Sequence, residues 1–185
     1  METAHLTENQ LLRLLKAARK QKHRSAERNW LMILVAYWHG LRAGEVVRLK
    51  GTDIRDGKII LRRGKGSETN LHSLVRHPNL LLNEAPALIK LAREVGDRPL
   101  FPYTRQHAYH LVHVIAESLD FPETHRKFHM LKHSIATHSV ARGVQIQYLQ
   151  KRLGWKSLSS VGVYLRPTDD QAEDAVMAAF RKGKP

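Results

Sequence analysis

The sequence contains no cysteine, and this absence removes several classes of site at once. Disulfide-stapled folds, thiolate metal sites and cysteine nucleophiles are all excluded. The longest apolar run, Leu31 to Trp38, is far shorter than the roughly 18 residues that a membrane-spanning helix needs, so we expect no membrane partner. Residues 1–5 also lack the basic and apolar segments of an export signal.

Acidic residues are scarce relative to basic ones. The 17 Asp and Glu against 31 Lys and Arg give a net charge of +14 over 185 residues. Such an excess favours a polyanionic partner, and nucleic acid is the first hypothesis, although a basic solvated surface is the simpler alternative. The apolar fraction of 42% and the charged fraction of 26% are typical of a folded domain with its own core.

Apolar periodicity predicts a mainly α-helical fold with one small antiparallel three-stranded β-sheet. A capping box of Thr7 and Gln10 opens the first helix, and Gly40 ends the second. Further helical patterns lie at about 45–49, 87–95, 106–119, 129–141, 146–153 and 158–165, with a last helix beginning near Thr168. The turn signal Asp56-Gly57 introduces strands at 58–63 and 69–75. Strands and helices do not alternate, so we expect no Rossmann-type sheet.

Residues that could act on a phosphodiester stand at several separate points of the chain, namely Arg42, Lys65, His129, Lys132, Trp155 and Tyr164. Cutting such a bond needs a nucleophile, positive charge for the non-bridging oxygens and an acid for the leaving oxygen, and these residue types supply all three. His129 and Lys132 stand about one helical turn apart and therefore share a face. Taken singly, Arg42 at a helix start, Lys65 on a turn and Trp155 in a core are ordinary structural residues.

Two further patterns have weaker functional interpretations. His129 and His133 are four residues apart and could bind a metal, but position 130 is not Glu and no third ligand is indicated, so we expect no metal site. Tyr37, Tyr103, Tyr109 and Tyr148 compete with Tyr164 as nucleophiles. A free phenol has a pKa of about 10 and needs a cationic site to react, so the residue type alone does not choose among the five.

The six residues that could act on a phosphodiester, taken in order with their neighbours, resemble the motifs of the tyrosine recombinases, the phage integrase family. Gly40–Glu45 resembles the box around the family's first catalytic Arg, and Gly64–Gly66 the hairpin that carries its catalytic Lys. His129–Thr137 resembles its His-x-x-Arg box, Leu153–Trp155 resembles its Leu-Gly-His/Trp step, and Tyr164 falls where the nucleophile belongs. Any one of these would be weak, whereas five in order form a specific signal.

The resemblance implies the tyrosine-recombinase catalytic-domain fold and a site-specific recombinase or integrase that breaks and rejoins double-stranded DNA. Tyr164 would attack a phosphate and become joined to the 3′ end, which releases a 5′ hydroxyl. Arg42 and Lys132 would bind the non-bridging oxygens, and Lys65 would protonate the leaving oxygen. No cofactor would be needed, because the phosphotyrosyl bond conserves the energy of the cleaved bond.

The remaining roles that the resemblance implies concern His129, which would transfer a proton or orient the phosphate, and Trp155, which would donate its indole N–H. One position departs from the family: Lys132 stands where Arg is usual, and it keeps the charge but loses the planar two-pronged donor set. A weak or inactive DNA-binding relative, or a topoisomerase IB-like enzyme that relaxes DNA, is therefore the alternative.

The expected organisation is a single catalytic domain over residues 1–185, with its core at 1–165 and a C-terminal helix and tail at 166–185. The family's usual N-terminal core-binding domain is not expected within these residues. Either the sequence is a piece of a longer protein, or it resembles the short recombinases that invert fimbrial switches, which also lack that domain. A C-terminal helix of this family commonly docks on a neighbouring subunit, which implies a homotetramer on paired DNA sites. Accessory DNA-bending proteins and a cytoplasmic, nucleoid-associated location fit the same expectation.

Overall fold

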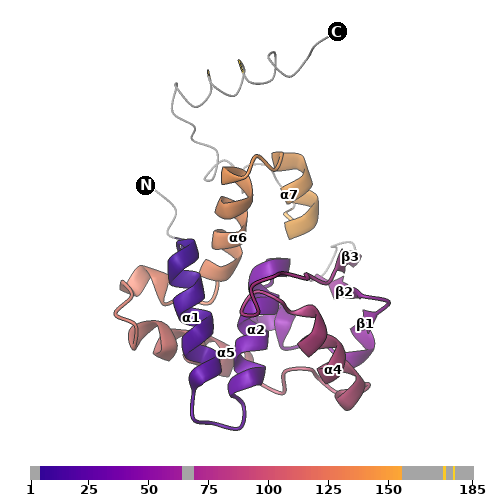
Figure 1. Ribbon diagram of the computed structural model, residues 1–185. Coiled ribbons are helices and arrows are strands. Elements are labelled where there is room, and N and C mark those ends of the chain that lie inside the picture. Colours follow the sequence, from indigo (N-terminus) through magenta and orange to yellow (C-terminus); the bar gives the residue numbers. More distant parts are fainter. Residues whose placement is uncertain (1–4, 64–68, 156–172, 174–176, 178–185) are drawn as a thin grey trace.

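The computed structural model describes residues 5–63 and 69–155, together with Glu173 and Met177 (Figure 1). The helices are α1 (Glu8–Lys20), α2 (Ala26–His39), α3 (Ala43–Val46), α4 (Ala85–Val95), α5 (Arg105–Glu117), α6 (Met130–Ala141) and α7 (Ile146–Leu153). Single 3-10 turns are η1 (Gly51–Asp53) and η2 (Glu123–His125), and the strands are β1 (Ile54–Arg55), β2 (Lys58–Arg62) and β3 (Thr69–Ser73). The predicted fold class, mainly helical with a three-stranded antiparallel sheet, is confirmed.

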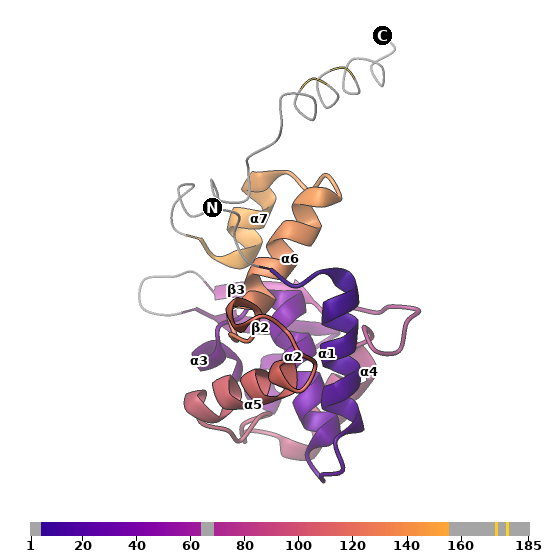
Figure 2. The same cartoon turned by 90° about the vertical axis from the view of Figure 1, so that its left-hand side faces the viewer.

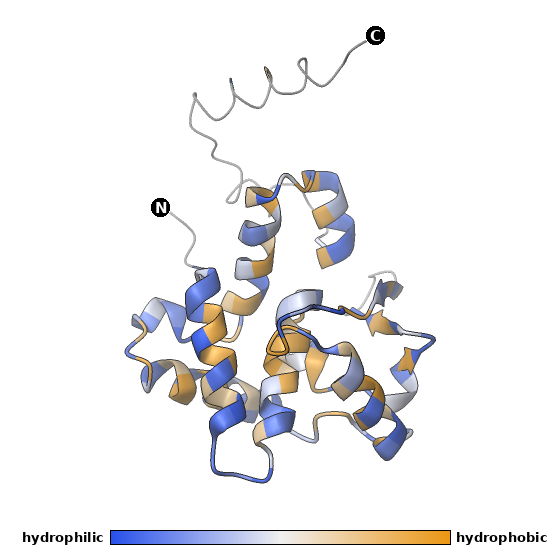
Figure 3. Cartoon of the chain, viewed as in Figure 1, coloured by the Kyte–Doolittle hydropathy of each residue, from blue (hydrophilic) through white to orange (hydrophobic). Residues whose placement is uncertain are grey.

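Helix α2 is the centre of the molecule (Figures 1 and 3). Every residue from Trp30 to Tyr37 is buried, which matches a stretch that is apolar on all sides and must be covered all round. Helices α1 and α6 both pack against α2. The apolar face of α1 points inward, and its start is set by Thr7, whose Oγ1 accepts from the N–H of Gln10 at 3.2 Å while Gln10 Oε1 accepts from the N–H of Thr7 at 2.9 Å.

Buried polar contacts join the beginning of the described chain to α6. The N–H of Leu6 donates to Ser134 Oγ at 2.8 Å, and the carbonyl of Leu6 lies 2.9 Å from His138 Nε2. The other ring nitrogen of His138 lies 2.9 Å from the hydroxyl of Tyr37 on α2. Since each of these buried polar groups has a partner, the bonds hold α6 against α2 and against the residues before α1 at little desolvation cost.

The sheet lies beside α2 and has the order β1-β2-β3, antiparallel throughout. Asp56 and Gly57 turn the chain with φ of 50° and 69°, the left-handed conformation that a two-residue hairpin requires. Ile59 and Leu61 face the core, where Ile59 pairs with His72. Strand β2 therefore presents alternate residues inward, and Arg63, directly after the strand, continues this pattern.

The structure shifts one predicted element and leaves others outside the described residues. The short helix expected at 45–49 is α3 instead, because the Glu45 carboxylate accepts from the N–H of Arg42 at 2.7 Å and makes Arg42 the N-cap. The helices expected at 158–165 and from Thr168 fall largely outside the described part of the chain, as does the predicted turn around Lys65. Among the helices that are described, none is long and apolar enough to cross a bilayer.

Candidate active site

The candidate residues Arg42, His129, Lys132 and Trp155 lie in the described part of the chain, whereas Lys65 and Tyr164 lie outside it. Helices α6 and α7 stand together at one end of the molecule, next to the end of α2 (Figure 2). Arg42 follows α2 and caps α3, His129 caps α6, Lys132 lies one turn inside α6, and Trp155 comes two residues after α7. Three helix termini therefore supply these side chains.

Lys132 is buried, with 6% of its surface exposed, and connects α6 to the end of α7. Its Nζ donates to the carbonyl of Leu153 at 2.7 Å. The same Nζ lies 5.9 Å from the centre of the Trp155 ring, within the range of a cation–π contact. The structure thus brings together Lys132 and Trp155, which come from two motifs more than twenty residues apart.

The charge of Lys132 is weakened by its surroundings. Burial lowers its pKa to about 7, and the nearby positive charges of Arg63 and Arg42 act in the same direction, while Glu45 opposes them. Lys132 is therefore only partly protonated at neutral pH. Because a phosphate would offset both the burial and the repulsion, its arrival would favour the charged form.

Arg42 is held by its backbone and leaves its side chain outward. Its N–H is bound by Glu45, whose other carboxylate oxygen lies 3.7 Å from the Arg42 guanidinium. The Arg42 side chain is 65% exposed, whereas that of Glu45 is 8% exposed. Glu45 therefore has a structural role in holding the backbone of Arg42, and the Arg42 guanidinium remains accessible to an anion from solvent.

His129 occupies an exposed position before α6, and its ring meets that of His133 edge to face, with 5.3 Å between ring centres. Partial burial and the charge of Lys127 lower the pKa of His129. Burial lowers the pKa of His133 to about 4, helped by the charges of His129 and Lys132. The pKa values of both rings are therefore shifted in the direction that favours the neutral form.

Two glycines allow the helix ends to approach each other. Gly40 and Gly154 end α2 and α7 with φ of 59° and 63°, the left-handed conformation that ends many helices. A Cβ at Gly40 would collide with the side chain of Leu153, and one at Gly154 would collide with the side chain of Arg63. The two helices can therefore meet here only where both residues lack a side chain.

Sequence reasoning missed Arg63, which lies at the middle of this meeting point. Its side chain is 3% exposed and donates to backbone carbonyls of both α2 and α7. The available signal was the strand period, since Ile59 and Leu61 face inward and position 63 continues that series.

Sequence reasoning also missed three buried polar side chains that join α2 to β3 and to the start of α4. His39 Nδ1 lies 3.0 Å from His72 Nδ1, and His39 Nε2 lies 2.8 Å from Glu84.

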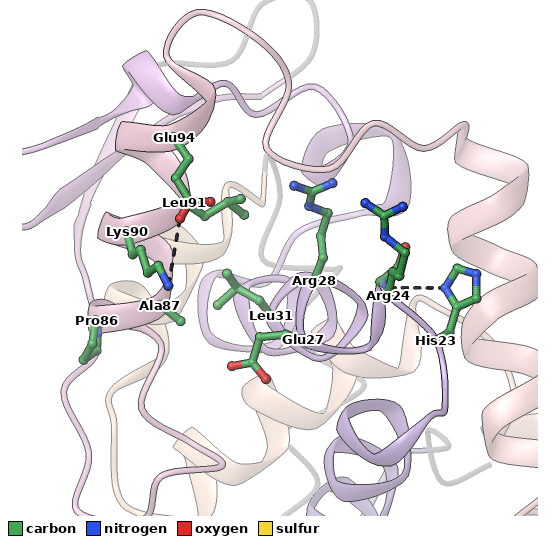
Figure 4. A pocket seen from close by; sticks show the side chains of 11 residues that line it. His23, Arg24, Glu27, Arg28, Leu31, Pro86, Ala87, Lys90, Leu91 and Glu94 are labelled. Carbon is green, nitrogen blue, oxygen red and sulfur yellow. Dashed lines mark hydrogen bonds and ion pairs between the residues drawn. The ribbon is translucent and has the colours of Figure 1, made fainter.

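A separate cavity of about 780 Å³ lies between the start of α2 and α4 (Figure 4). Basic side chains of Arg24, Arg28 and Lys90 share its lining with the acidic Glu27 and Glu94. None of the candidate residues lines it. Within residues 5–63 and 69–155, no group of three His, Asp or Glu side chains is arranged to bind a metal ion.

The sequence pattern of the phage integrase family matches residues 4–171, which is most of the chain. The chain belongs to the phage integrase family. Among family members, it is 32% identical over 183 residues to the tyrosine recombinase XerA of Pyrococcus furiosus, and covers 61% of that protein with 94% of its own length. It is 33% identical over 179 residues to the tyrosine recombinase XerD of Xanthomonas axonopodis pv. citri, with 86% of this chain and 57% of XerD covered.

Solved structures of the same family share the fold. The chain superposes on the XerH site-specific recombinase bound to its difH substrate in a pre-cleavage complex, with a TM-score of 0.76, 24% identity, and 95% of this chain and 55% of XerH covered. On the catalytic domain of bacteriophage HP1 integrase the TM-score is 0.67 with 19% identity, and 95% of both chains is covered. The predicted catalytic-domain fold is therefore confirmed, and the chain spans about three fifths of the length of the XerA relative.

Proposed function

We propose that the chain is the catalytic domain of a site-specific recombinase that breaks and rejoins double-stranded DNA through a covalent bond between Tyr164 and a 3′ phosphate. The observation that carries this proposal is the convergence of Arg42, Lys132 and Trp155, each from a different motif, beside one pair of helix ends. Membership of the phage integrase family supports the same reaction.

In the proposed cleavage step the phenolic oxygen of Tyr164 attacks the phosphorus atom and loses its proton. The bond between phosphorus and the 5′ oxygen breaks, and Lys65 gives that oxygen a proton. Charge accumulates on the non-bridging oxygens during the attack, where positioned cations stabilise the transition state. Arg42 reaches them from solvent, and Lys132 reaches them by exchanging the Leu153 carbonyl for a phosphate oxygen.

The other two candidates have supporting roles in this proposal. Neutral His129 can accept a proton or orient the phosphate, in line with the lowered pKa of its ring. The indole N–H of Trp155 donates to the phosphate, while its ring faces the Lys132 ammonium. The reverse reaction, in which a 5′ hydroxyl attacks the phosphotyrosine, rejoins the strand without a metal or a nucleotide cofactor.

The partner in this proposal is double-stranded DNA, consistent with the net charge of +14. We propose that residues 1–185 act as one domain and that four copies assemble on two paired sites, in the cytoplasm and on the nucleoid. Accessory DNA-bending proteins would assist that assembly. Light scattering on a two-site DNA that finds only one copy for each DNA molecule would contradict the tetramer.

The experiment that tests the reaction is a denaturing gel. The protein is incubated with labelled, nicked duplexes that tile the DNA flanking its gene, because a nick lets a short fragment diffuse away and traps the covalent step. We expect a band that carries both protein and label, and no such band from Tyr164→Phe, which should still shift DNA on a native gel. An adduct formed by Tyr164→Phe would refute Tyr164 as the nucleophile.

The second candidate function is DNA binding without strand cleavage. It is favoured by one observation, the hydrogen bond that ties Lys132 to the Leu153 carbonyl in a site where the family usually has Arg. Salt-sensitive binding with no adduct on any nicked duplex would favour this second function. Relaxation of plasmids regardless of sequence would instead indicate an enzyme of the topoisomerase IB type.

A further inference from the structure

Arg63 is the residue through which the two helix ends contact each other. Its Nη1 donates to the carbonyls of Leu153 at 2.9 Å and Gly40 at 3.3 Å. Its Nη2 donates to the carbonyls of His39 and Arg152, both at 2.9 Å. One guanidinium therefore serves the last carbonyls of α2 and the last carbonyls of α7 at the same time.

The chemistry of this contact explains why Arg stands at this position. The final carbonyls of a helix have no partner inside the helix and carry partial negative charge. Here two such ends face each other, and a planar cation with several fixed donors can satisfy both, which a lysine ammonium cannot do with the same geometry. Burial lowers the pKa of Arg63, and Arg42 and Arg152 lower it further while Glu45 opposes them, but an Arg stays charged.

Arg63 is also adjacent to the residues on both sides of the candidate site. On one side, its Nη1 lies 4.0 Å from the Glu45 carboxylate that holds the backbone of Arg42. On the other side, Arg63 and Lys132 donate to the same carbonyl, that of Leu153. The position of the Lys132 ammonium thus depends on a carbonyl that Arg63 holds in place.

We propose that Arg63 is a positioning residue of the candidate active site, which sets the separation of Arg42, Lys132 and Trp155 by clamping the ends of α2 and α7 together. The effect of Arg63 on catalysis rests on the proposed function. Its effect on Lys132, in contrast, can be measured in the absence of DNA.

The clamp has an electrostatic consequence for Lys132. The charged or titratable groups that act on Lys132 come from several elements: Arg63 after β2, Arg42 before α3, Glu45 on α3 and His133 on α6. Removing the charge of Arg63 would leave Lys132 with less repulsion and raise its pKa. Because burial is the largest cause of the lowered pKa, loosening of the helix ends that admits water to Lys132 would raise the pKa as well. Arg63→Lys separates the two causes, since it keeps the charge but loses the fixed fork of donors.

The test compares Arg63→Met, Arg63→Lys and a matched control, Arg62→Met. Arg62 is the preceding residue, is 66% exposed, and forms an ion pair with Asp53 outside the site. On nicked DNA we expect Arg63→Met to bind as the unaltered protein does but to form adduct about 10- to 100-fold more slowly, because small displacements of reacting groups cost rates of that order. Arg63→Lys should be slowed less, and Arg62→Met should keep the rate of the unaltered protein.

A second readout works without DNA. Lys132 lies over the ring of Trp155, so the Trp155 indole N–H signal in a nuclear magnetic resonance spectrum should report its titration. The protein has three tryptophans, and Trp155→Phe identifies the signal. We expect a midpoint near 7 that disappears in Lys132→Met, since burial, Arg63 and Arg42 lower the pKa of Lys132 to about 7. The midpoint should rise by roughly one pH unit in Arg63→Met and remain in Arg63→Lys and Arg62→Met.

The outcomes separate this inference from the proposed function. If the unaltered protein forms no adduct but the midpoint moves in Arg63→Met and not in Arg63→Lys, the proposed reaction is contradicted and the placement of the Arg63 charge beside Lys132 is supported. If the unaltered protein forms adduct and Arg63→Met matches it in rate and midpoint, the clamp is wrong and the reaction stands. Should Arg63→Met fail to fold, Arg63→Lys carries the test, and an unchanged adduct rate in Arg63→Lys would overturn the inference.

Discussion

Lys132 carries an ionisable amine in a place that water barely reaches. Burial and two arginines lower its pKa to about 7, so its charge disappears over the range in which most intracellular reactions are measured. The catalytic role proposed for Lys132 would therefore depend on pH in a way that an arginine's would not. The replacement of the family's usual Arg by Lys132 should therefore be detectable in the pH dependence of adduct formation.

The first prediction concerns that signature. At protein concentrations well below saturation, where the rate reports the DNA-free protein, adduct formation should fall as the pH rises through about 7, because Lys132, whose pKa is lowered by burial, Arg63 and Arg42, then loses its proton. Lys132→Arg should remove this fall, since a guanidinium stays charged throughout. Single-turnover rates on one nicked duplex across the pH range measure the effect. Lys127→Arg, a change of the same type at an exposed lysine, is the control, and a fall that persists in Lys132→Arg would contradict the prediction.

The second prediction concerns stability. Lys132→Met should abolish adduct formation and yet raise the free energy of unfolding at pH 6 by roughly 1–3 kcal/mol, because a buried charge is replaced by an apolar side chain of similar length. The gain should shrink as the pH rises from about 7 towards 10.5: the unfolded chain then binds more protons than the folded chain, so the unaltered protein gains stability with pH. Urea unfolding at several pH values measures it. If Lys132→Met is no more stable than the unaltered protein at pH 6, burial of the charged Lys132 side chain does not destabilise the fold.

At the scale of secondary-structure elements, the ends of the helices were the easiest features to predict and their mutual contacts the hardest. Thr7 and Gly40 mark their helix ends because capping is a local interaction with neighbouring residues, and α7 begins and ends where its pattern predicts. The contacts of Arg63 could not be predicted in this way, since its acceptors are backbone carbonyls far away in sequence that carry no side-chain signal. Lys65 and Tyr164 remain predictions.

The third prediction tests the close approach of the helix ends. Gly154→Ala and Gly143→Ala both put a Cβ on a residue with positive φ, of 63° and 77° respectively, which costs about 1–2 kcal/mol in either case. A Cβ at Gly143 meets nothing within 4 Å, whereas one at Gly154 collides with Arg63. Gly154→Ala should therefore lose clearly more stability in urea and most of the adduct rate. Equal losses in both variants would show that backbone strain alone matters.

The fourth prediction concerns the first helix. Thr7→Ala removes the side-chain acceptor for the N–H of Gln10 and should cost about 1 kcal/mol of stability. Thr7→Ser keeps the hydroxyl and should cost little. Thermal or urea unfolding distinguishes them, and equal stability of Thr7→Ala and the unaltered protein would mean that the cap contributes nothing in this fold.

For the molecule as a whole, the charge excess has a direct experimental consequence. If the net charge of +14 serves DNA binding, the logarithm of the binding constant should fall linearly with the logarithm of salt concentration, with a slope of about −0.9 for each phosphate contacted. Arg42→Gln should make that slope shallower by about one phosphate, because its exposed guanidinium is proposed to contact one. Fluorescence anisotropy at several salt concentrations measures both, and an unchanged slope would place Arg42 away from the DNA.

The four-carbonyl contact of Arg63 also has a consequence for how the chain folds. Its bonds span 24 residues to His39 and 90 residues to Leu153, so the chain must close long loops before any of them forms. We expect contacts of that kind to form after the transition state for folding, in which case losing them speeds unfolding with little effect on the folding rate. In stopped-flow experiments Arg63→Met should therefore alter mainly the unfolding limb. We therefore expect the described part of the candidate site to assemble late in folding and to open early in unfolding.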